Sequence, residues 1–113
     1  MVKDTTYVPE RGDIVWLDFD PQLGHEQRGR RPALTLSRAA YNGKVGLALF
    51  CPITTKVKGY PFEVAVAGKH IAGCVLSDQV KSLDWMVRNI EFIEKLEAER
   101  LAEVIENVSL LIE

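Results

Sequence analysis

The sequence lacks any apolar run long enough to cross a membrane, and its first residues do not resemble a secretion signal. A membrane-spanning helix needs about 20 largely apolar residues, and no run approaches that length. The opening stretch MVKDTT has no apolar segment of the kind that signal peptides contain. We therefore expect a cytoplasmic protein that does not bind a membrane.

Cysteine is scarce, and the common cofactor motifs are missing. Cys51 and Cys74 lie in apolar surroundings, without the Cys-x-x-Cys or Cys/His spacing of a zinc site. We interpret both as buried strand thiols. The sequence also lacks the GxGxxG, Walker and HExxH patterns. We therefore expect no cofactor and no metal. Without these patterns, the sequence gives no main support for nucleotide-cofactor chemistry or for zinc proteolysis.

The charged residues, in contrast, are numerous and unevenly placed. The 113 residues have an average composition and predict one domain over residues 1–113, with a core that needs no disulfide. The net charge is only −2, yet residues 25–58 carry a net charge of +6 and residues 91–113 a net charge of −5. The basic segment favours a polyanionic or acidic-peptide partner, and the acidic segment predicts a solvated helix face.

Short apolar runs separated by turn residues predict several strands. Gln22–Arg30 is polar and predicts a loop, Tyr41–Lys44 predicts a turn, and residues 78–85 fit either a strand or a helical turn. The predicted strands are Asp13–Phe19, Ala33–Ser37, Val45–Cys51, Phe62–Val66, Gly73–Leu76 and Met86–Ile93.

The C-terminal segment has helical periodicity. Its apolar residues line one face of a helix of roughly 15 residues that we expect to dock on the sheet. These residues are Leu101, Val104, Ile105, Val108, Leu111 and Ile112. The whole pattern predicts a mainly β (α+β) fold, a strongly bent sheet or partly open barrel closed by one amphipathic helix.

Two polar segments hold the candidate chemistry. They are His25–Pro32, which is rich in arginine, and Thr54–Gly59. If their strands are neighbours, the two segments border one cavity with guanidinium groups, hydroxyls and one carboxylate, which suits phosphate. RNA is the natural candidate ligand, because its 2′-hydroxyl is a built-in nucleophile. A protein then needs to supply only a proton acceptor, a proton donor and positive charge.

Arg31 and Thr54 are candidate catalytic residues. Arg31 can hold a phosphate bidentately. A guanidinium stays protonated at neutral pH, which makes it a poor general base. Glu26 and His25 are better bases, and Thr54 can donate a hydrogen bond to a phosphate oxygen. Alternatives remain: Arg31 as a strand-end salt bridge, Glu26 and His25 as solvated loop residues, and Thr54 as a turn hydroxyl.

The aromatic residues divide into two groups. Trp16, Phe19, Phe50 and Phe62 sit within apolar runs and predict core positions. Trp85 and Tyr60 lie nearer polar segments and are better candidates for stacking on bases, while His70 is interpreted as a surface turn residue.

Five collinear blocks of this sequence resemble the MazF/PemK family of type II toxin–antitoxin ribonucleases. The resemblance covers nearly the whole chain in order. The blocks are Gly12–Pro21, Gly24–Gln27 with Arg31–Ala33, Pro52–Thr55, Lys58–Val64 and Leu76–Ser82.

The resemblance implies both a fold and an activity. The fold would be an SH3-like small barrel of the PemK/CcdB type with a C-terminal helix, assembled as a two-fold homodimer. The activity would be metal-independent, sequence-specific cleavage of single-stranded RNA, chiefly messenger RNA, leaving 2′,3′-cyclic phosphate and 5′-hydroxyl ends. It also implies inhibition by a cognate MazE-like antitoxin, whose acidic C-terminal segment would lie along the basic groove.

The resemblance further assigns site residues. It implies that Arg31 and Thr54 are the catalytic pair and that Glu26 is a functional position. The other polar and basic side chains of the two segments are expected to bind RNA: His25, Gln27, Arg28, Arg30, Lys56 and Lys58. His25 stands where relatives often have serine, which leaves open whether it transfers protons or only adds phosphate affinity.

Two other functions compete with this interpretation. A gyrase poison like CcdB would use the same fold, but its hallmark Trp-Gly-Ile ending is replaced here by Leu-Ile-Glu. An inactive RNA-binding module would explain the basic segment, but it would not explain the match at Arg31 and Thr54.

Overall fold

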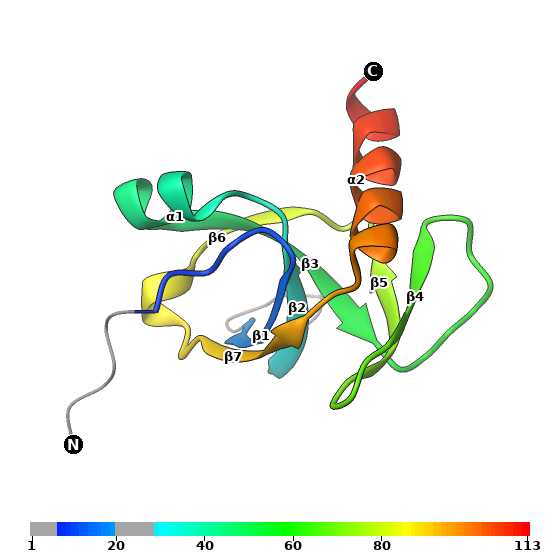
Figure 1. Ribbon diagram of the computed structural model, residues 1–113, viewed down its shortest axis with the longest axis horizontal. Helices are drawn as coiled ribbons and strands as arrows, with labels where there is room; N and C mark the ends of the chain where they lie inside the picture. Colours follow the sequence, from blue (N-terminus) through cyan, green and yellow to red (C-terminus); the bar gives the residue numbers. More distant parts are fainter. Residues whose placement is uncertain (1–6, 20–28) are drawn as a thin grey trace.

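The computed structural model describes residues 7–19 and 29–113. The described residues form a curled antiparallel sheet of seven strands, with two helices and one short 3₁₀ helix (Figure 1). In chain order the elements are β1 (Asp13–Asp18), β2 (Arg30–Thr35), α1 (Ala39–Val45), β3 (Leu47–Thr54), β4 (Glu63–Ala67), β5 (Ala72–Leu76), β6 (Lys81–Asp84), η1 (Trp85–Val87), β7 (Glu91–Lys95) and α2 (Ala98–Ile112).

The sheet is bent because β3 belongs to both of its halves. The strand order is β4-β5-β3-β2-β1-β7, and β6 pairs with β3 outside this path. Residues 47–50 of β3 pair with β6, whereas Ile53 and Thr54 at its other end pair with β5. The sheet therefore curls into a half-barrel whose outermost strands are β4 and β7. The predicted mainly β fold with a bent sheet and a C-terminal helix is confirmed.

Strands β1, β2 and β3 are buried on both faces. Successive residues such as Ile14 and Val15 belong to two different hydrophobic clusters, because side chains alternate between the faces of a strand. One cluster lies against α2 through Val104, and the other includes Phe19, Phe50 and Trp85. Two-sided burial explains why these strands are continuous apolar runs in the sequence.

Helix α2 packs on the first cluster through most of its apolar face. Leu101, Ile105 and Val108 are partly buried against this cluster, and Val104 is fully buried. The expected apolar face is wrong at the last turn, where Leu111 is 46% and Ile112 84% exposed. The helix extends past the sheet that covers its first turns (Figure 1).

Helix α1 corrects the turn predicted at residues 41–44. The sequence Tyr41-Asn42-Gly43-Lys44 lies inside a seven-residue helix that ends at Gly46, whose φ of 83° suits glycine. Asn42 is fully buried, and its Nδ2 donates to the carbonyls of Pro9 (2.7 Å) and Ser37 (3.0 Å). Its side chain is thus satisfied by distant backbone, which favours a helix over a surface turn.

The strand predicted over Met86–Ile93 is also partly wrong. Met86 and Val87 belong to η1, whose start is capped by Asp84, because Asp84 Oδ1 accepts a 3.1 Å hydrogen bond from Met86 N. Asn89, with a φ of 51°, follows the turn, and β7 begins only at Glu91. The ambiguous segment 78–85 holds β6.

The two cysteines are buried and free, as predicted. Desolvation, with a smaller contribution from the charge of Asp78, raises the pKa of the Cys51 thiol to about 12. A thiol held neutral in this way is a packing group, not a nucleophile. Within the described part of the chain, neither helix has the length and apolar character required to pass through a lipid bilayer.

Candidate active site

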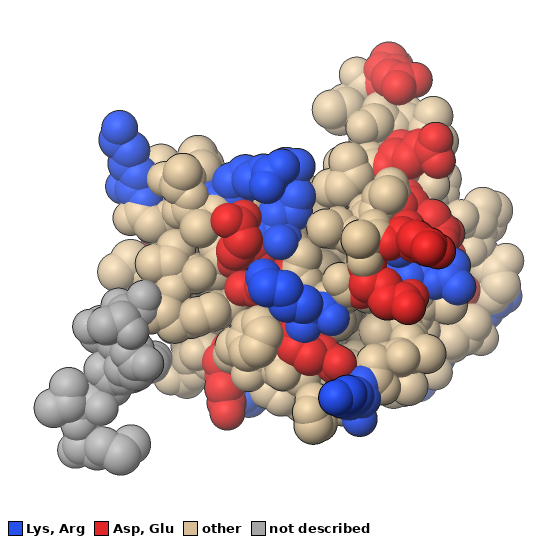
Figure 2. Space-filling model, in the orientation of Figure 1, with Lys and Arg blue, Asp and Glu red and all other residues tan. Residues whose placement is uncertain are grey.

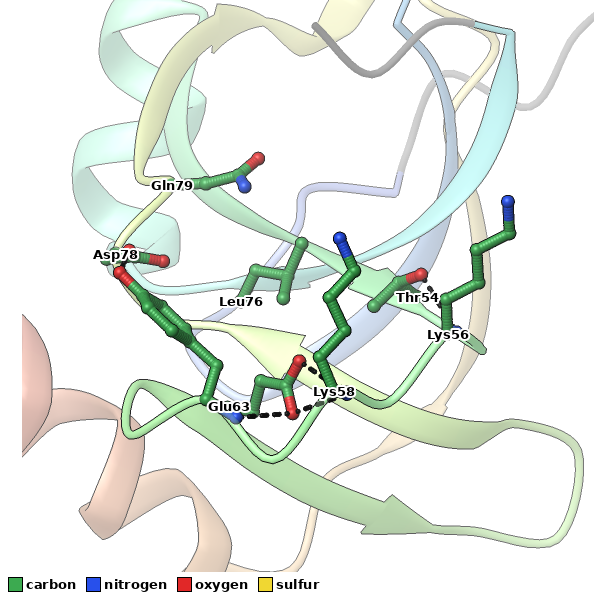
Figure 3. A pocket seen from close by; sticks show the side chains of 8 residues that line it. Thr54, Lys56, Lys58, Glu63, Leu76, Asp78 and Gln79 are labelled. Carbon is green, nitrogen blue, oxygen red and sulfur yellow. Dashed lines mark hydrogen bonds between the residues drawn. The ribbon is translucent and has the colours of Figure 1, made fainter. Parts of the chain in front are cut away.

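Thr54 ends β3 at the edge of a cavity of about 520 Å³ (Figure 3). Its hydroxyl oxygen accepts a hydrogen bond from the backbone N–H of Lys56 at 3.1 Å, which fixes the hydroxyl in a local turn. Lys56 and Lys58 extend their ammonium groups on the same side as that hydroxyl (Figure 3). The residues that line the cavity are Thr54, Lys56, Lys58, Tyr60, Glu63, Leu76, Asp78 and Gln79.

Glu63 shapes the loop that carries the two lysines. Its carboxylate accepts hydrogen bonds from the backbone N–H groups of Lys58 (3.1 Å), Gly59 (3.0 Å) and Tyr60 (3.3 Å). Desolvation acts to raise the pKa of Glu63, but the three N–H groups outweigh it and hold the pKa below its ordinary value. An ionised Glu63 therefore holds the loop in one shape, with both lysines beside Thr54.

Asp78 holds the other side of the same cavity. Tyr60 is 47% exposed, and its hydroxyl donates to Asp78 Oδ2 at 2.6 Å. This hydrogen bond and the charge of Asp78 raise the pKa of Tyr60. Among the described residues, Asp78 Oδ1 is buried without a hydrogen-bond partner. The carboxylate thus places the Tyr60 ring at the cavity, where the sequence predicted a stacking residue.

A second cavity, of about 430 Å³, lies on the other side of the end of β3. Ile53 and Thr55 line it, whereas Thr54 between them lines the first cavity, as expected for alternating side chains. Its full lining is Trp16, Arg30, Arg31, Pro32, Ile53, Thr55, His70, Ile71 and Ala72.

Arg31 and Thr54 come from neighbouring strands. Strand β2 pairs with β3 in a register that sets Ala33 opposite Pro52. This register pairs residues 33–35 of β2 with residues 50–52 of β3, and Arg31 and Thr54 each lie two residues beyond it on their strands. The two polar segments therefore meet at the second cavity through Arg31 and Thr55, whereas Thr54 lines the first cavity.

Arg30, the residue before Arg31, makes ion pairs at the end of its strand. Its guanidinium contacts Asp18 at 3.1 Å and Glu91 at 3.1 Å, joining β2 to the neighbouring β1 and to the residue that begins β7, the strand beyond β1. These two carboxylates offset its charge, so Arg30 adds less positive potential to the cavity than its sequence position suggests.

Four predicted site residues, Glu26, His25, Gln27 and Arg28, lie outside the described residues. The identity of the general base therefore stays a prediction.

Two aromatic predictions need correction. Trp85, expected as a stacking residue, is only 6% exposed, and its Nε1 donates to the carbonyl of Asn42 at 3.1 Å. Trp16, expected in the core, instead lines the second cavity. Phe19 and Phe50 are fully buried, as predicted. Burial of Trp85 follows from the helical conformation of α1, which supplies the carbonyl of Asn42.

Three lining residues have no counterpart in the sequence prediction: Glu63, Asp78 and Gln79. His70, interpreted as a surface turn residue, is exposed between β4 and β5 and also lines the second cavity. Glu63 and Asp78 act mainly on groups of the intervening loop, so no charge pattern reveals them. Their presence within two of the resemblance blocks was the available signal. Within residues 7–19 and 29–113, no three histidine, cysteine, aspartate or glutamate side chains are grouped to hold a metal ion.

Comparison with known proteins identifies the class to which this fold and site belong. Residues 10–112 match the family described as PemK-like, MazF-like toxin of type II toxin–antitoxin system, and the chain belongs to this family. The match extends from just before β1 to the end of α2.

Particular relatives are similar over most of their length. The chain is 54% identical over 82 residues to the endoribonuclease toxin MazF of Escherichia coli K12, covering 73% of this chain and 74% of that protein. It is 40% identical over 94 residues to the endoribonuclease toxin ChpB of the same organism, covering 78% of each. The names of these relatives support endoribonuclease activity.

Solved structures agree in fold. The MazF structure from Deinococcus radiodurans superposes with a TM-score of 0.89 at 51% identity, covering 94% of this chain and 97% of that one. A MazE–MazF structure from the same organism gives a TM-score of 0.83 at 46% identity, with 94% and 96% coverage. An endoribonuclease from Mycobacterial species shares only the fold, with a TM-score of 0.76 at 16% identity.

Proposed function

We propose that this chain is the toxin of a type II toxin–antitoxin pair and cleaves single-stranded RNA, chiefly messenger RNA, at specific sequences in the cytoplasm. The observation that carries the proposal is that Arg31 and Thr54 lie on neighbouring strands, β2 and β3, in a member of this family. The lysines beside Thr54 add positive charge where a phosphate backbone would lie.

The proposed reaction is a transesterification that needs no metal. The ribose 2′-oxygen attacks phosphorus while the bond from phosphorus to the 5′-oxygen breaks. The 2′-hydroxyl proton passes to a base, and the leaving 5′-oxygen takes a proton. The products are a 2′,3′-cyclic phosphate and a 5′-hydroxyl.

Each candidate residue has a distinct task in this reaction. Arg31 holds the phosphate and stabilises the charge that develops on its oxygens, since a guanidinium stays protonated. Thr54 donates a hydrogen bond to a nonbridging oxygen. Glu26 or His25 serves as the base, and Lys56 and Lys58 bind flanking phosphates.

Cleavage of a defined RNA in the presence of EDTA tests the proposal. We expect the wild-type protein to cut, and Arg31→Ala to lower the rate at least roughly 100-fold, with an unchanged circular dichroism spectrum. Arg38→Ala is the matched control, because Arg38 is an exposed arginine that lines neither cavity. Parental cleavage by Arg31→Ala would contradict the assigned role, and RNA binding without scission by the wild type would indicate a binding module.

The role of the 2′-hydroxyl is tested on the substrate side. A single deoxyribose at the mapped cut site should abolish cleavage there, and mass spectrometry of the natural product should find a cyclic phosphate. Cutting of the deoxyribose substrate would contradict the mechanism, since no internal nucleophile would remain.

The partners follow from the same proposal. We infer that a MazE-like antitoxin binds this chain through an acidic C-terminal segment, supported by the MazE–MazF structures among its neighbours. Binding of RNA and of antitoxin should both weaken between 50 and 200 mM salt. An RNA affinity unchanged over that range would remove the electrostatic account.

The proposed homodimer would bury exposed apolar side chains. These exposed side chains are Val45 of α1, Leu49 of β3, and Met86 and Val87 of η1, and α1 and η1 each pack against β3. Val87→Glu should shift the protein to monomers in analytical ultracentrifugation, because it places a charge on this surface. A dimer of unchanged stability in this variant would place the interface elsewhere.

A further inference from the structure

A single carboxylate, that of Glu94, joins the two edges of the half-barrel. Glu94 lies on β7, and its oxygens accept hydrogen bonds from the backbone N–H groups of Lys69 (3.0 Å), His70 (2.9 Å) and Ile71 (3.1 Å). These three residues form the tip of the hairpin between β4 and β5. We call this arrangement the Glu94 clasp.

The hairpin turn is shaped to hold the Glu94 carboxylate. The hairpin turn is closed by a hydrogen bond from Gly68 N to the carbonyl of Ile71 at 2.8 Å, which directs the intervening N–H groups toward one point. A Cβ atom on Gly68 would lie only 2.5 Å from Glu94 Oε2, so glycine leaves the space that the carboxylate fills. The N–H of His70 first, and then those of Lys69 and Ile71, hold the pKa of Glu94 below its ordinary value against desolvation.

The clasp determines what lies above the second cavity. Glu94 pairs with Ile14 of β1, the strand that also pairs with β2 and Arg31. The hairpin tip is therefore attached to the same part of the sheet that presents Arg31. His70, an exposed turn residue of this tip, lines the second cavity together with Trp16 and Arg31. Strand β7 leads directly into α2, and the hairpin lies beside that connection (Figure 1).

The cavity has the composition of a nucleotide subsite. Its volume of about 430 Å³ is in the range of small-ligand pockets. It combines an aromatic ring, an imidazole and a guanidinium, which suit the face of a base, its edge and a phosphate respectively. None of the residues that line it carries a carboxylate, and Arg30, which does line it, pairs with Asp18 and Glu91.

We propose that His70 is a substrate-binding residue that contacts the RNA nucleotide next to the phosphate held by Arg31, and that Glu94 is the positioning residue that holds it there. This inference rests on the proposed function and adds to it a base-reading subsite. His70 contributes binding, and the proton transfers remain with other groups.

Steady-state cleavage of a short RNA tests His70. His70→Ala should raise KM roughly 5- to 100-fold, the range for losing one base contact, and leave kcat within about two-fold. Lys69→Ala is the matched control, because Lys69 adjoins His70 and donates to the same carboxylate through its backbone, but its side chain does not line the cavity. End-mapping should also show a relaxed base preference at one position next to the cut in His70→Ala.

The positioning role of Glu94 has a separate signature. Glu94→Gln should raise KM as His70→Ala does, and the double variant should be no worse than His70→Ala alone, since both act through one contact. In case Glu94→Gln unfolds, a nuclear magnetic resonance titration of the wild-type protein with uncleavable 2′-deoxy oligonucleotide provides a second measurement. The His70 ring signals should shift on binding.

The outcomes separate this inference from the proposed function. A parental KM in His70→Ala, a fall in kcat at constant KM, or unshifted His70 ring signals would each overturn the subsite while leaving RNA cleavage intact. A wild-type protein that cuts no RNA would contradict the proposed function, and the subsite with it.

Discussion

Glu63 and Glu94 make the same kind of hydrogen bonds to backbone in two regions of the molecule, but the structural consequences differ. Each accepts hydrogen bonds from three consecutive backbone N–H groups. Glu63 reaches residues three to five positions earlier and shapes its own loop, whereas Glu94 reaches residues 23 to 25 positions earlier. The first contact fixes where two lysines lie beside Thr54, and the second joins opposite edges of the sheet.

The difference shows that a local anchor and a long-range anchor have different roles at this site. A local anchor restrains a segment that is already short, so its loss frees few residues. A long-range anchor closes a much longer segment, whose release gains more conformational entropy. We therefore expect the Glu94 clasp to matter more for the stability of the fold and Glu63 to matter more for the shape of the lysine loop.

The largest effect should come from Gly73→Ala, which disturbs both regions. Gly73 has a φ of 143°, and a Cβ there would lie 2.2 Å from the carbonyl oxygen of Thr54. Backbone must move, so β5 would separate from the end of β3 at the start of the lysine loop. We expect a loss of roughly 3 kcal/mol or more in the free energy of unfolding, measured in urea.

Gly43→Ala is the control for that variant. Gly43 is helical, and its new methyl group would meet only the side chain of Val8, at 3.3 Å. The free energy of unfolding should change by no more than about 1 kcal/mol. Equal losses in the two variants would show that the approach of Gly73 to Thr54 has no special importance.

The next effect compares the two carboxylates directly. In both variants glutamine keeps one carbonyl oxygen where three N–H groups share two carboxylate oxygens. Glu94→Gln should nevertheless lower Tm at least twice as much as Glu63→Gln, because it weakens the long-range contact, which closes the longer segment. Thermal unfolding followed by circular dichroism measures both variants. A larger fall for Glu63→Gln would reverse the proposed division between local and long-range anchors.

Acid should weaken both anchors. The pKa values of Glu63 and Glu94 are lowered in the folded protein, so each contribution to stability is complete above the unfolded value near 4.5. It is lost as the pH falls below that value through the folded pKa. Urea unfolding between pH 6 and 3 should show this loss in the wild type and a shallower dependence in each glutamine variant. An equally steep dependence in the double variant would assign the acid sensitivity to other carboxylates.

The smallest effect should come from Tyr60→Phe. This change removes the exposed hydrogen bond to Asp78 and leaves the three backbone contacts of Glu63 in place. Tm should be nearly unchanged, while KM for RNA rises roughly two- to five-fold because the ring is less well held at the cavity. A large fall in Tm would show that Asp78, and not Glu63, is the main anchor of the loop.

The sequence was sufficient to predict the elements whose signals are local. The apolar runs of β1 and β3 and the helical spacing from Leu101 to Val108 predict buried strands and a docked helix, and the structure confirms both. The segment around Asn42 misled the prediction, because its turn-forming residues are held in a helix by Pro9 and Ser37. Burial of Trp85 follows from the same misassigned helix.

The sequence was sufficient to predict which residue types the site contains, but not how those residues are arranged in space. Arg31 and Thr54 stand out through their polar segments, and the structure places their strands side by side. The charge of Arg30, in contrast, looks available in sequence, yet it is paired with carboxylates 12 and 61 residues away. The two glutamate anchors bind backbone, which has no charge signature, so only the resemblance block that contains Glu63 pointed to either of them.

The two-sided burial of β1, β2 and β3 restricts how this chain can change in evolution. Inserting one residue into any of these strands would exchange every following side chain between the two cores, so that both lose their fit at once. Insertions in the connecting loops carry no such penalty. We therefore expect descendants of this chain to diversify through loop length and composition, while the three central strands keep a constant number of residues.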